Sequence, residues 1–249
     1  MTDPKPLVGI LQCGERPEGL SEDFGDYDTL FHALLGHEAF RYRTWRALDG
    51  DLPDTVNEAD AWLLTGSRFG AYEEHDWIPP LEAFVRDVHT AGVPMLGICF
   101  GHQLIAQALG GRVEKFSGGW SIGRVEYRFD TAGIGLPAFD ALPDHAVPLM
   151  AWHQDQVVEP PPGARVVAAS DLCRNAAMVY GDSIFTVQPH PEFGPLFVQG
   201  LLDTRGKAVP APLRERAAAT LDEPLARESV AEIMRLFVLQ ALERTRSAT

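Results

Sequence analysis

The segment Val93–Gly111, VPMLGICFGHQLIAQALGG, constrains the fold of this chain more than any other stretch. It opens on a short apolar run, residues 93–98, whose length suits a buried parallel strand. Apolar residues then recur at helical spacing before a Gly-Gly pair: Leu104, Ile105, Ala108 and Leu109. The segment therefore predicts a strand, a tight turn and a helix, which is one unit of an open α/β sheet.

Cys99 lies at the predicted turn, between Gly97 and Gly101. A small nucleophilic side chain flanked by glycines between a strand and a helix is typical of a nucleophile elbow. Glycines suit this place because the nucleophile's backbone is strained and the strand and helix approach closely. The helix N-terminus would favour a thiolate and later an oxyanion. The alternative is an inert buried cysteine, because cysteine also behaves as a small hydrophobe.

A second signal is the apolar strand Ser183–Val187 with the sequence QPHPE directly after it. Two prolines bracket His190 and stiffen its loop. Glu192 follows two residues later, so a turn would let its carboxylate fold back on the imidazole and direct the other ring nitrogen toward a thiol. Together the two signals predict a Cys99–His190–Glu192 triad for nucleophilic catalysis.

The sequence GICFGHQLIAQALGG resembles the nucleophile segment of class I (triad-type) glutamine amidotransferases, and the resemblance runs from LVGILQ near the N-terminus to the last helix. It implies an α/β three-layer sandwich with a mostly parallel central sheet, helices on both faces and flavodoxin-like topology. We expect a single domain over residues 1–249, with a catalytic core over about 5–195 and a C-terminal helical segment over about 196–246.

The resemblance also implies an oxyanion hole. Gly66, in the sequence TGS, matches the loop that supplies one N–H, and Phe100, the residue after the nucleophile, would supply the other. An ordinary turn glycine is the alternative for Gly66.

Further residues are implied to contact the amino and carboxylate groups of a glutamine substrate: Gln103, Gly119, Trp120 and Ser121. For Gln103 the alternative is an exposed helix residue. The stretch Trp152–Val157 resembles a family segment that lines the cleft; within it a structural role is expected for His153, which Asp155 could orient.

Patterns elsewhere predict the remaining elements. Apolar or alternating runs predict strands at 7–12, 40–45, 61–65, 112–116, 123–129, 166–169 and 176–180. Helical spacing predicts helices at 26–35, 81–91, 196–202, 213–221 and 229–242, with fraying after Glu243. Residues 129–148 are expected to be a connection. Cys13 follows the first predicted strand, at the end where open α/β sheets bind ligands, and the favoured alternative is a loop cysteine without function. No catalytic role is expected for Cys173.

Composition narrows the function classes. The formal net charge of −14 argues against nucleic-acid binding, because phosphates would be repelled. Three cysteines argue for a reducing compartment and against a disulfide framework or a four-cysteine zinc site. No apolar run reaches 18 residues and no signal peptide is recognised, so we expect a cytoplasmic protein that does not span a membrane. The chemistry requires no metal or cofactor.

The resemblance implies cysteine-dependent hydrolysis of the γ-glutamyl amide bond of glutamine or a γ-glutamyl compound, through a γ-glutamyl thioester. The chain has no phosphate-binding loop of the form GxxxxGK followed by Ser or Thr, so a synthase active site is not expected within it. It would then be a free-standing hydrolase, like stand-alone relatives such as γ-glutamyl peptidases, or a glutaminase subunit that supplies ammonia to a separate synthase. Two further alternatives are a non-catalytic regulatory member and a chaperone- or protease-like protein with a similar cysteine elbow. The latter leaves the HPE sequence unexplained.

Overall fold

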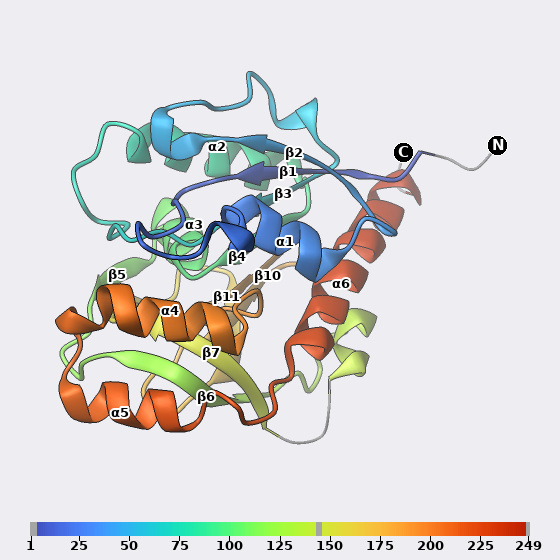
Figure 1. Cartoon of the computed structure of the whole chain (residues 1–249). Coiled ribbons are helices and arrows are strands. Elements are labelled where there is room, and N and C mark those ends of the chain that lie inside the picture. The colour runs from blue at the N-terminus through green and yellow to red at the C-terminus, as the bar shows by residue number, and fades with distance from the viewer. Residues whose placement is uncertain (1–3, 143–145, 248–249) are drawn as a thin grey trace.

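A computed structural model describes residues 4–142 and 146–247 (Figure 1). Within them the chain forms a nine-stranded sheet. In spatial order its strands are β2 (Arg41–Trp45), β1 (Leu7–Leu11), β3 (Ala61–Leu64), β4 (Met95–Ile98), β11 (Ile184–Val187), β10 (Ala177–Tyr180), β9 (Ala164–Ala169), β6 (Ser121–Phe129) and β7 (Val147–His153). The α/β class predicted from the sequence is confirmed.

The sheet is mixed. Its first half, β2-β1-β3-β4-β11, is parallel throughout and has the strand order of flavodoxin-like folds. Beyond β11 every pairing is antiparallel, including that of β9 with β10, two strands that the sequence predicts. The parallel arrangement expected for most of the sheet therefore describes the half that contains the cysteine elbow.

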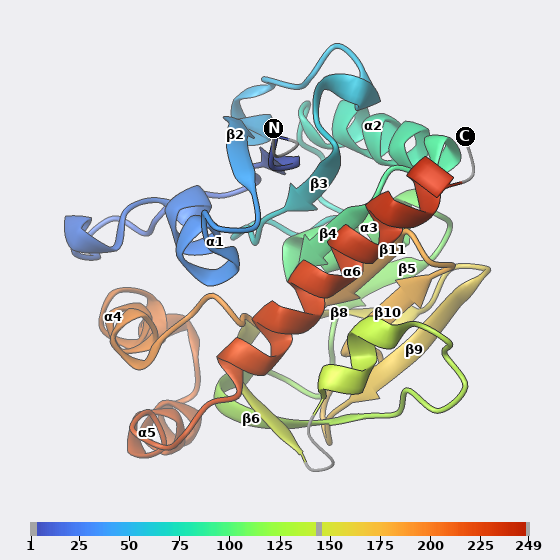
Figure 2. The same ribbon diagram turned by 90° about the vertical axis from the view of Figure 1, so that its right-hand side faces the viewer.

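Helices cover both faces of the parallel half (Figure 2). The helices α1 (Tyr27–Leu35) and α6 (Arg227–Ser247) pack on one face, and α2 (Ile78–Ala91) and α3 (Phe100–Ala108) on the other. Because successive strand residues point to opposite faces, Leu63 joins the core under α1 and α6, whereas Trp62 and Leu64 join the core under α2 and α3. The parallel strands are thus buried on both sides.

Local sequence explains where these helices begin and end. The Asp26 side chain accepts a hydrogen bond from the Tyr27 N–H and caps α1. Two prolines occupy the first turn of α2, where their missing N–H groups cost nothing. Gly92 follows α2 with a φ of 67°, a left-handed conformation that glycine adopts without steric cost.

The stretch 147–159 departs most from expectation. It forms β7 and then β8 (Asp155–Glu159), and β8 pairs with β5 (Arg112–Lys115) in a separate two-stranded sheet. The prediction of a connection over 129–148 is wrong at its end, because β7 already begins at Val147. Strand β6, predicted to begin at residue 123, begins at Ser121, which pairs with His153.

The C-terminal part is helical, as expected. The helices α4 (Pro195–Arg205) and α5 (Ala211–Ala219) precede α6; α5 packs beside β6, and α4 contacts α5. The expected fraying after Glu243 is wrong: α6 continues to Ser247, where Arg244 forms an ion pair with Asp182 and the Ser247 hydroxyl donates to the Glu243 carbonyl. Among the described residues, no helix has the length and apolar character needed to cross a membrane.

Candidate active site

Three neighbouring parallel strands deliver the predicted site residues to one edge of the sheet. Gly66 follows β3, Cys99 follows β4, and His190 follows β11, and these strands are adjacent in the order β3-β4-β11. Because parallel strands end at the same edge, the topology alone gathers these residues. Segments that lie far apart in the chain therefore meet at the carboxyl ends of the strands.

The elbow has the geometry that its glycines imply. Cys99 has φ 52° and ψ −100°, and it is the one non-glycine residue with positive φ among those the structure describes. A Cβ on Gly97 would lie 2.6 Å from Ile105 Cδ1, and one on Gly101 would collide with the Leu64 carbonyl oxygen. The Cys99 N–H donates to the Val187 carbonyl at 2.9 Å, which ties the strained residue to β11.

His190 is held from several directions. Its backbone N–H donates to the Met150 carbonyl at 2.8 Å, and its ring stacks on Phe193 with centroids 3.9 Å apart and an interplanar angle of 4°. Arg227, the first residue of α6, donates to the Pro191 carbonyl at 2.7 Å and to the Glu192 carbonyl at 3.0 Å. These contacts restrain the proline-bracketed loop and the orientation of the imidazole.

Glu192 folds back on the imidazole. Its Oε1 lies 2.6 Å from His190 Nδ1, and both side chains are buried. The Cys99 side chain also interacts with the ring. Burial alone would lower the pKa of His190, but the Glu192 carboxylate and the Cys99 sulfur outweigh it and raise that pKa well above its ordinary value. The arrangement favours an imidazolium beside the sulfur.

Gly66 and Phe100 both have an N–H free beside the nucleophile. A Cβ on Gly66 would lie 3.0 Å from His190 Cε1 and 3.9 Å from Cys99 Cβ, so only glycine leaves that space open. Phe100 opens α3, where N–H groups lack an intrahelical acceptor. In the described part of the chain neither N–H has an acceptor.

A chain of hydrogen bonds between buried side-chain amides ends at the Cys99 sulfur. Its central residue, Gln188, was not predicted from the sequence. Its Nε2 donates to Cys99 Sγ at 3.5 Å, and its Oε1 accepts from Gln103 Nε2 at 3.1 Å. The Gln103 Nε2 also donates to the Asp155 carbonyl at 2.9 Å. Gln103 lines the pocket as expected, but its amide nitrogen is engaged with protein acceptors, and the alternative of an exposed helix residue is wrong.

His153 lines the same pocket as a neutral group. Its Nδ1 must donate to the Asp155 carbonyl, 3.2 Å away, because a carbonyl oxygen only accepts. The backbone of Asp155 therefore orients the ring, while the carboxylate accepts from the Tyr72 hydroxyl at 3.2 Å. Burial, together with the neighbouring charge of His190, lowers the pKa of His153 to about 3.

Of the three other residues predicted to contact the substrate, one lines the pocket and two do not. Trp120 lines the pocket beside Trp152, with ring centroids 6.4 Å apart, whereas Gly119 and Ser121 do not line it. Cys13 is fully buried with its thiol directed to the Leu11 carbonyl, and burial raises the pKa of that thiol. The structure thus places Cys13 outside the pocket.

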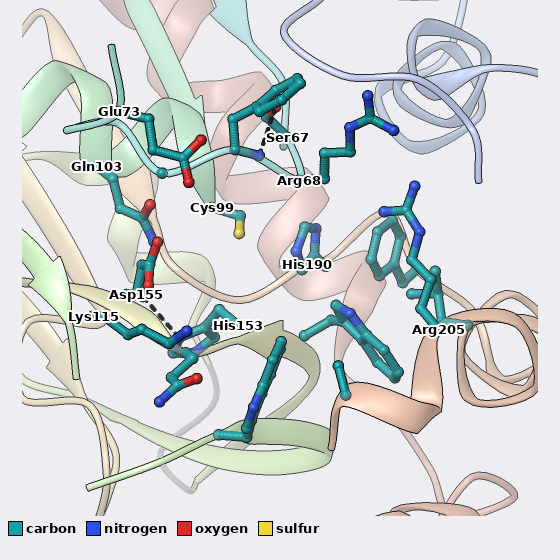
Figure 3. A pocket seen from close by; sticks show the side chains of 18 of the residues that line it. Ser67, Arg68, Glu73, Cys99, Gln103, Lys115, His153, Asp155, His190 and Arg205 are labelled. Carbon is teal, nitrogen blue, oxygen red and sulfur yellow. Dashed lines mark hydrogen bonds between the residues drawn. The ribbon is translucent and has the colours of Figure 1, made fainter. Parts of the chain in front are cut away.

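The pocket itself has a volume of about 570 Å³ (Figure 3). Figure 3 shows the Cys99 sulfur between His190 on one side and Gln103 with Asp155 on the other. Cationic side chains that the sequence reasoning did not single out also line it, namely Arg68, Lys115, Arg205 and Lys207. No group of three or more His, Cys, Asp or Glu among the described residues is placed to bind a metal.

Comparisons with known proteins agree with this architecture. The family model for glutamine amidotransferase class-I matches residues 53–196, which include the elbow and the HPE sequence. The chain is 29% identical over 198 residues to gamma-glutamyl peptidase 2 of Arabidopsis thaliana, covering 78% of this chain and 79% of that protein. It is 37% identical over 142 residues to a glutamine-hydrolyzing GMP synthase subunit of Sulfolobus acidocaldarius, covering 56% of this chain and 70% of that protein.

Solved structures share the fold. A glutamine amidotransferase from Thermotoga maritima superimposes with a TM-score of 0.71 at 21% identity, covering 96% of this chain and 98% of that one. A glutamine amidotransferase from Methylobacillus flagellatus also gives 0.71, at 23% identity, covering 96% and 94%. The family match extends over more than half of the sequence, and this chain belongs to the class I glutamine amidotransferase family.

Proposed function

We propose that this protein hydrolyses the γ-glutamyl amide bond of glutamine or of a γ-glutamyl compound through a covalent γ-glutamyl thioester on Cys99. The observation that carries the proposal is the buried Cys99–His190–Glu192 arrangement at the carboxyl edge of the sheet. A nucleophile, a base and a group that orients the base are the parts that acyl transfer requires.

In the first half-reaction, the Cys99 sulfur attacks the γ-carbonyl carbon and His190 holds the thiol proton. The S–C bond forms, and the carbonyl oxygen becomes an oxyanion that the N–H groups of Gly66 and Phe100 are placed to bind; one such donor is worth about 3 kcal/mol in enzymes of this kind. His190 then gives its proton to the leaving nitrogen, the C–N bond breaks, and ammonia or an amine departs. The Glu192 carboxylate stabilises the imidazolium throughout.

In the second half-reaction, water replaces the amine. His190 takes a proton from the water, the hydroxide attacks the thioester carbonyl, and the S–C bond breaks. Glutamate is released and the thiol is restored, so the net reaction consumes one water per amide bond. We propose the same residues for both halves, within one domain that spans the chain. A thiolate nucleophile suits a reducing compartment, which supports a cytoplasmic location.

Two versions of this activity differ in what receives the nitrogen. A free-standing γ-glutamyl hydrolase is supported by the relative named gamma-glutamyl peptidase, which aligns over most of both chains. A glutaminase subunit that passes ammonia to a synthase is supported by the GMP synthase relative, with higher identity over a shorter stretch. The pocket volume lies in the range, about 300 to 1,000 Å³, of small-molecule sites, and the peptidase relative aligns over more of both chains than the synthase relative does. We therefore favour the free-standing hydrolase.

A product assay with glutamine and γ-glutamyl dipeptides side by side tests the proposal. We expect glutamate from the dipeptides, and loss of all activity in Cys99→Ala and Cys99→Ser. Cys173→Ala is the matched control, because Cys173 is buried in the core and does not line the pocket. Ammonia from glutamine alone would favour the glutaminase version. No product from either substrate, with a Cys99 that a glutamine-analogue electrophile fails to label, would contradict the proposal.

A further inference from the structure

The pocket beside Cys99 is cationic, although the chain is acidic. The chain has 35 Asp and Glu against 21 Lys and Arg. The pocket lining reverses this balance, with four Lys and Arg side chains against two carboxylates, those of Glu73 and Asp155. A cluster of one sign that opposes the net charge of the protein attracts a ligand of opposite sign.

The two carboxylates do not neutralise the arginines. Glu73 Oε2 is 2.9 Å from His75 Nε2, and Asp155 Oδ2 accepts from the Tyr72 hydroxyl. In the part of the chain that the structure describes, neither Arg68 nor Arg205 has a carboxylate partner. Arg68 lies over the Phe69 ring, with its guanidinium carbon 4.8 Å from the centroid.

Several other arginines of the described chain are matched by carboxylates, unlike Arg68 and Arg205. Arg46 lies close to three carboxylates, and Arg112 and Arg124 each pair with two. Arg205 is half-buried at the end of α4, where a guanidinium has less water around it to compensate its charge. Its fork of N–H donors matches a carboxylate.

The position of these arginines says which part of a substrate they would meet. In the proposed reaction His190 protonates the departing nitrogen, so the leaving portion must lie on the His190 side of the sulfur. Figure 3 shows Arg68 and Arg205 on that side of Cys99, and Lys115 with Asp155 on the opposite side. The zwitterionic α-amino and α-carboxylate end of the glutamyl group would then face Lys115 and Asp155, which offer both signs of charge.

We infer that Arg68 and Arg205 form an anion subsite for a carboxylate on the leaving portion of the substrate. The inference rests on the proposed function and narrows it. The substrate class is a γ-glutamyl amino acid or peptide with a free carboxylate, and hydrolysis yields glutamate and that amino acid or peptide. Glutamine and γ-glutamyl amines lack the recognised group.

A matched pair of substrates tests the subsite. γ-Glutamylglycine and γ-glutamylglycinamide share the scissile bond and differ in one terminal carboxylate. We expect kcat/KM of the full-length protein to be at least about tenfold higher for γ-glutamylglycine, the discrimination typical of one charge-assisted hydrogen bond. The ratio should fall as salt is added, because the arginines are reached by solvent.

Variants assign the effect to the arginines. Arg205→Gln and Arg68→Gln should each move the ratio of the two kcat/KM values toward one. Arg205→Glu should turn the preference toward γ-glutamylethylenediamine, whose leaving portion is cationic, and a misfolded protein cannot produce such a gain. Arg216→Gln, an exposed residue of α5 away from the pocket, is the control and should keep the wild-type ratio.

Each other outcome overturns a defined statement. Equal kcat/KM for the acid and the amide in wild type would overturn the subsite while leaving the proposed function intact, because both compounds are still hydrolysed. If Arg205→Gln and Arg68→Gln both keep the wild-type preference for γ-glutamylglycine over γ-glutamylglycinamide, the assignment of the subsite to Arg68 and Arg205 is overturned. Failure to hydrolyse either compound or glutamine would overturn the proposed function, and the subsite with it.

Discussion

At the scale of single residues, three features define the environment of Cys99. Its backbone is strained at φ 52°, its sulfur interacts with the His190 imidazole, and Gln188 donates a hydrogen bond to the same sulfur. The first two features follow from motifs visible in the sequence. The third depends on the side-chain orientation of Gln188 and on the Gln103 amide that holds it.

Replacing Gln188 tests whether its donor stabilises negative charge on sulfur. Gln188→Leu keeps similar bulk but removes the N–H. Because hydrogen bonds to charged groups contribute about 1.5 to 3 kcal/mol, alkylation of Cys99 by iodoacetamide at pH 7 should slow by about tenfold or more. The rate is measured by quenching the alkylation at successive times and determining the alkylated fraction of Cys99 by mass spectrometry. Gln199→Leu on the exposed face of α4 is the control, and an unchanged rate in Gln188→Leu would remove any role for the donor.

Gln188 also shows which property of a single residue cannot be predicted from the sequence. It lies two residues before His190 at the end of β11, so its position at the catalytic edge could be anticipated. Its function could not, because nothing in a linear sequence tells which way a buried amide turns. The same limit applies to Gln103, which lines the pocket as predicted but donates to protein acceptors.

At the scale of elements, the β4–α3 elbow works only while strand and helix remain in close contact. Gly101→Ala places a Cβ against the Leu64 carbonyl on neighbouring β3. We expect a loss of about 2 kcal/mol in the free energy of unfolding, since overpacking a tight core costs about 1 to 3 kcal/mol. Activity should fall as well, because the displaced turn carries Cys99.

Urea denaturation of Gly101→Ala and of the control Gly194→Ala measures the loss in the free energy of unfolding for each variant. A Cβ on Gly194 meets its nearest neighbour, an Arg227 nitrogen, at an ordinary 3.5 Å, so that variant should lose less than about 1 kcal/mol. Equal losses in the two variants would show that close approach at Gly101 is not what requires glycine.

Elements with strong local patterns could be predicted, and those with weak ones could not. The elbow, α2 and the short strands of the parallel half have uninterrupted apolar runs or clear helical spacing. Strand β7 carries Pro148 and is buried at positions that do not alternate, so neither period is visible in its sequence. Its pairing with β6 supplies the order that its own residues do not indicate.

At the scale of the whole molecule, two buried histidines link stability to pH. Burial is the main cause that lowers the pKa of His102 and of His153 to about 3, against an ordinary value near 6.5. Both are neutral in the folded protein, whereas the unfolded chain binds their protons below pH 6.5. Stability is therefore fully present above that pH and falls as pH decreases, by about 1.4 kcal/mol per pH unit for each histidine.

Urea denaturation between pH 7.5 and about 5 measures this slope. His102→Gln should reduce the slope below pH 6.5 by up to about 1.4 kcal/mol per pH unit, whatever its effect on absolute stability. His89→Gln, on the exposed side of α2, should leave the slope unchanged. Identical slopes in wild type and His102→Gln would mean that His102 is protonated in the folded state.

The architecture of the whole chain was predictable in its parallel half, because each buried strand there is followed by a recognisable turn or helix. The antiparallel half of the sheet and the lining of the pocket were less predictable from the sequence. Pocket residues such as Arg68 and Arg205 come from a loop and from the end of α4, and only the fold brings them to Cys99. No local sequence motif indicates that these two arginines lie in the same pocket as Cys99.

The central claim is that Cys99 carries the γ-glutamyl group during turnover. Acid-quenched mass spectrometry of wild-type protein, taken during hydrolysis of γ-glutamylglycine and followed by peptide mapping, tests it most directly. The account predicts the added mass of one γ-glutamyl group on the Cys99 peptide, removable by hydroxylamine and absent in Cys99→Ala. Turnover that proceeds with the Cys99 peptide unmodified, or that persists in Cys99→Ala, would contradict it.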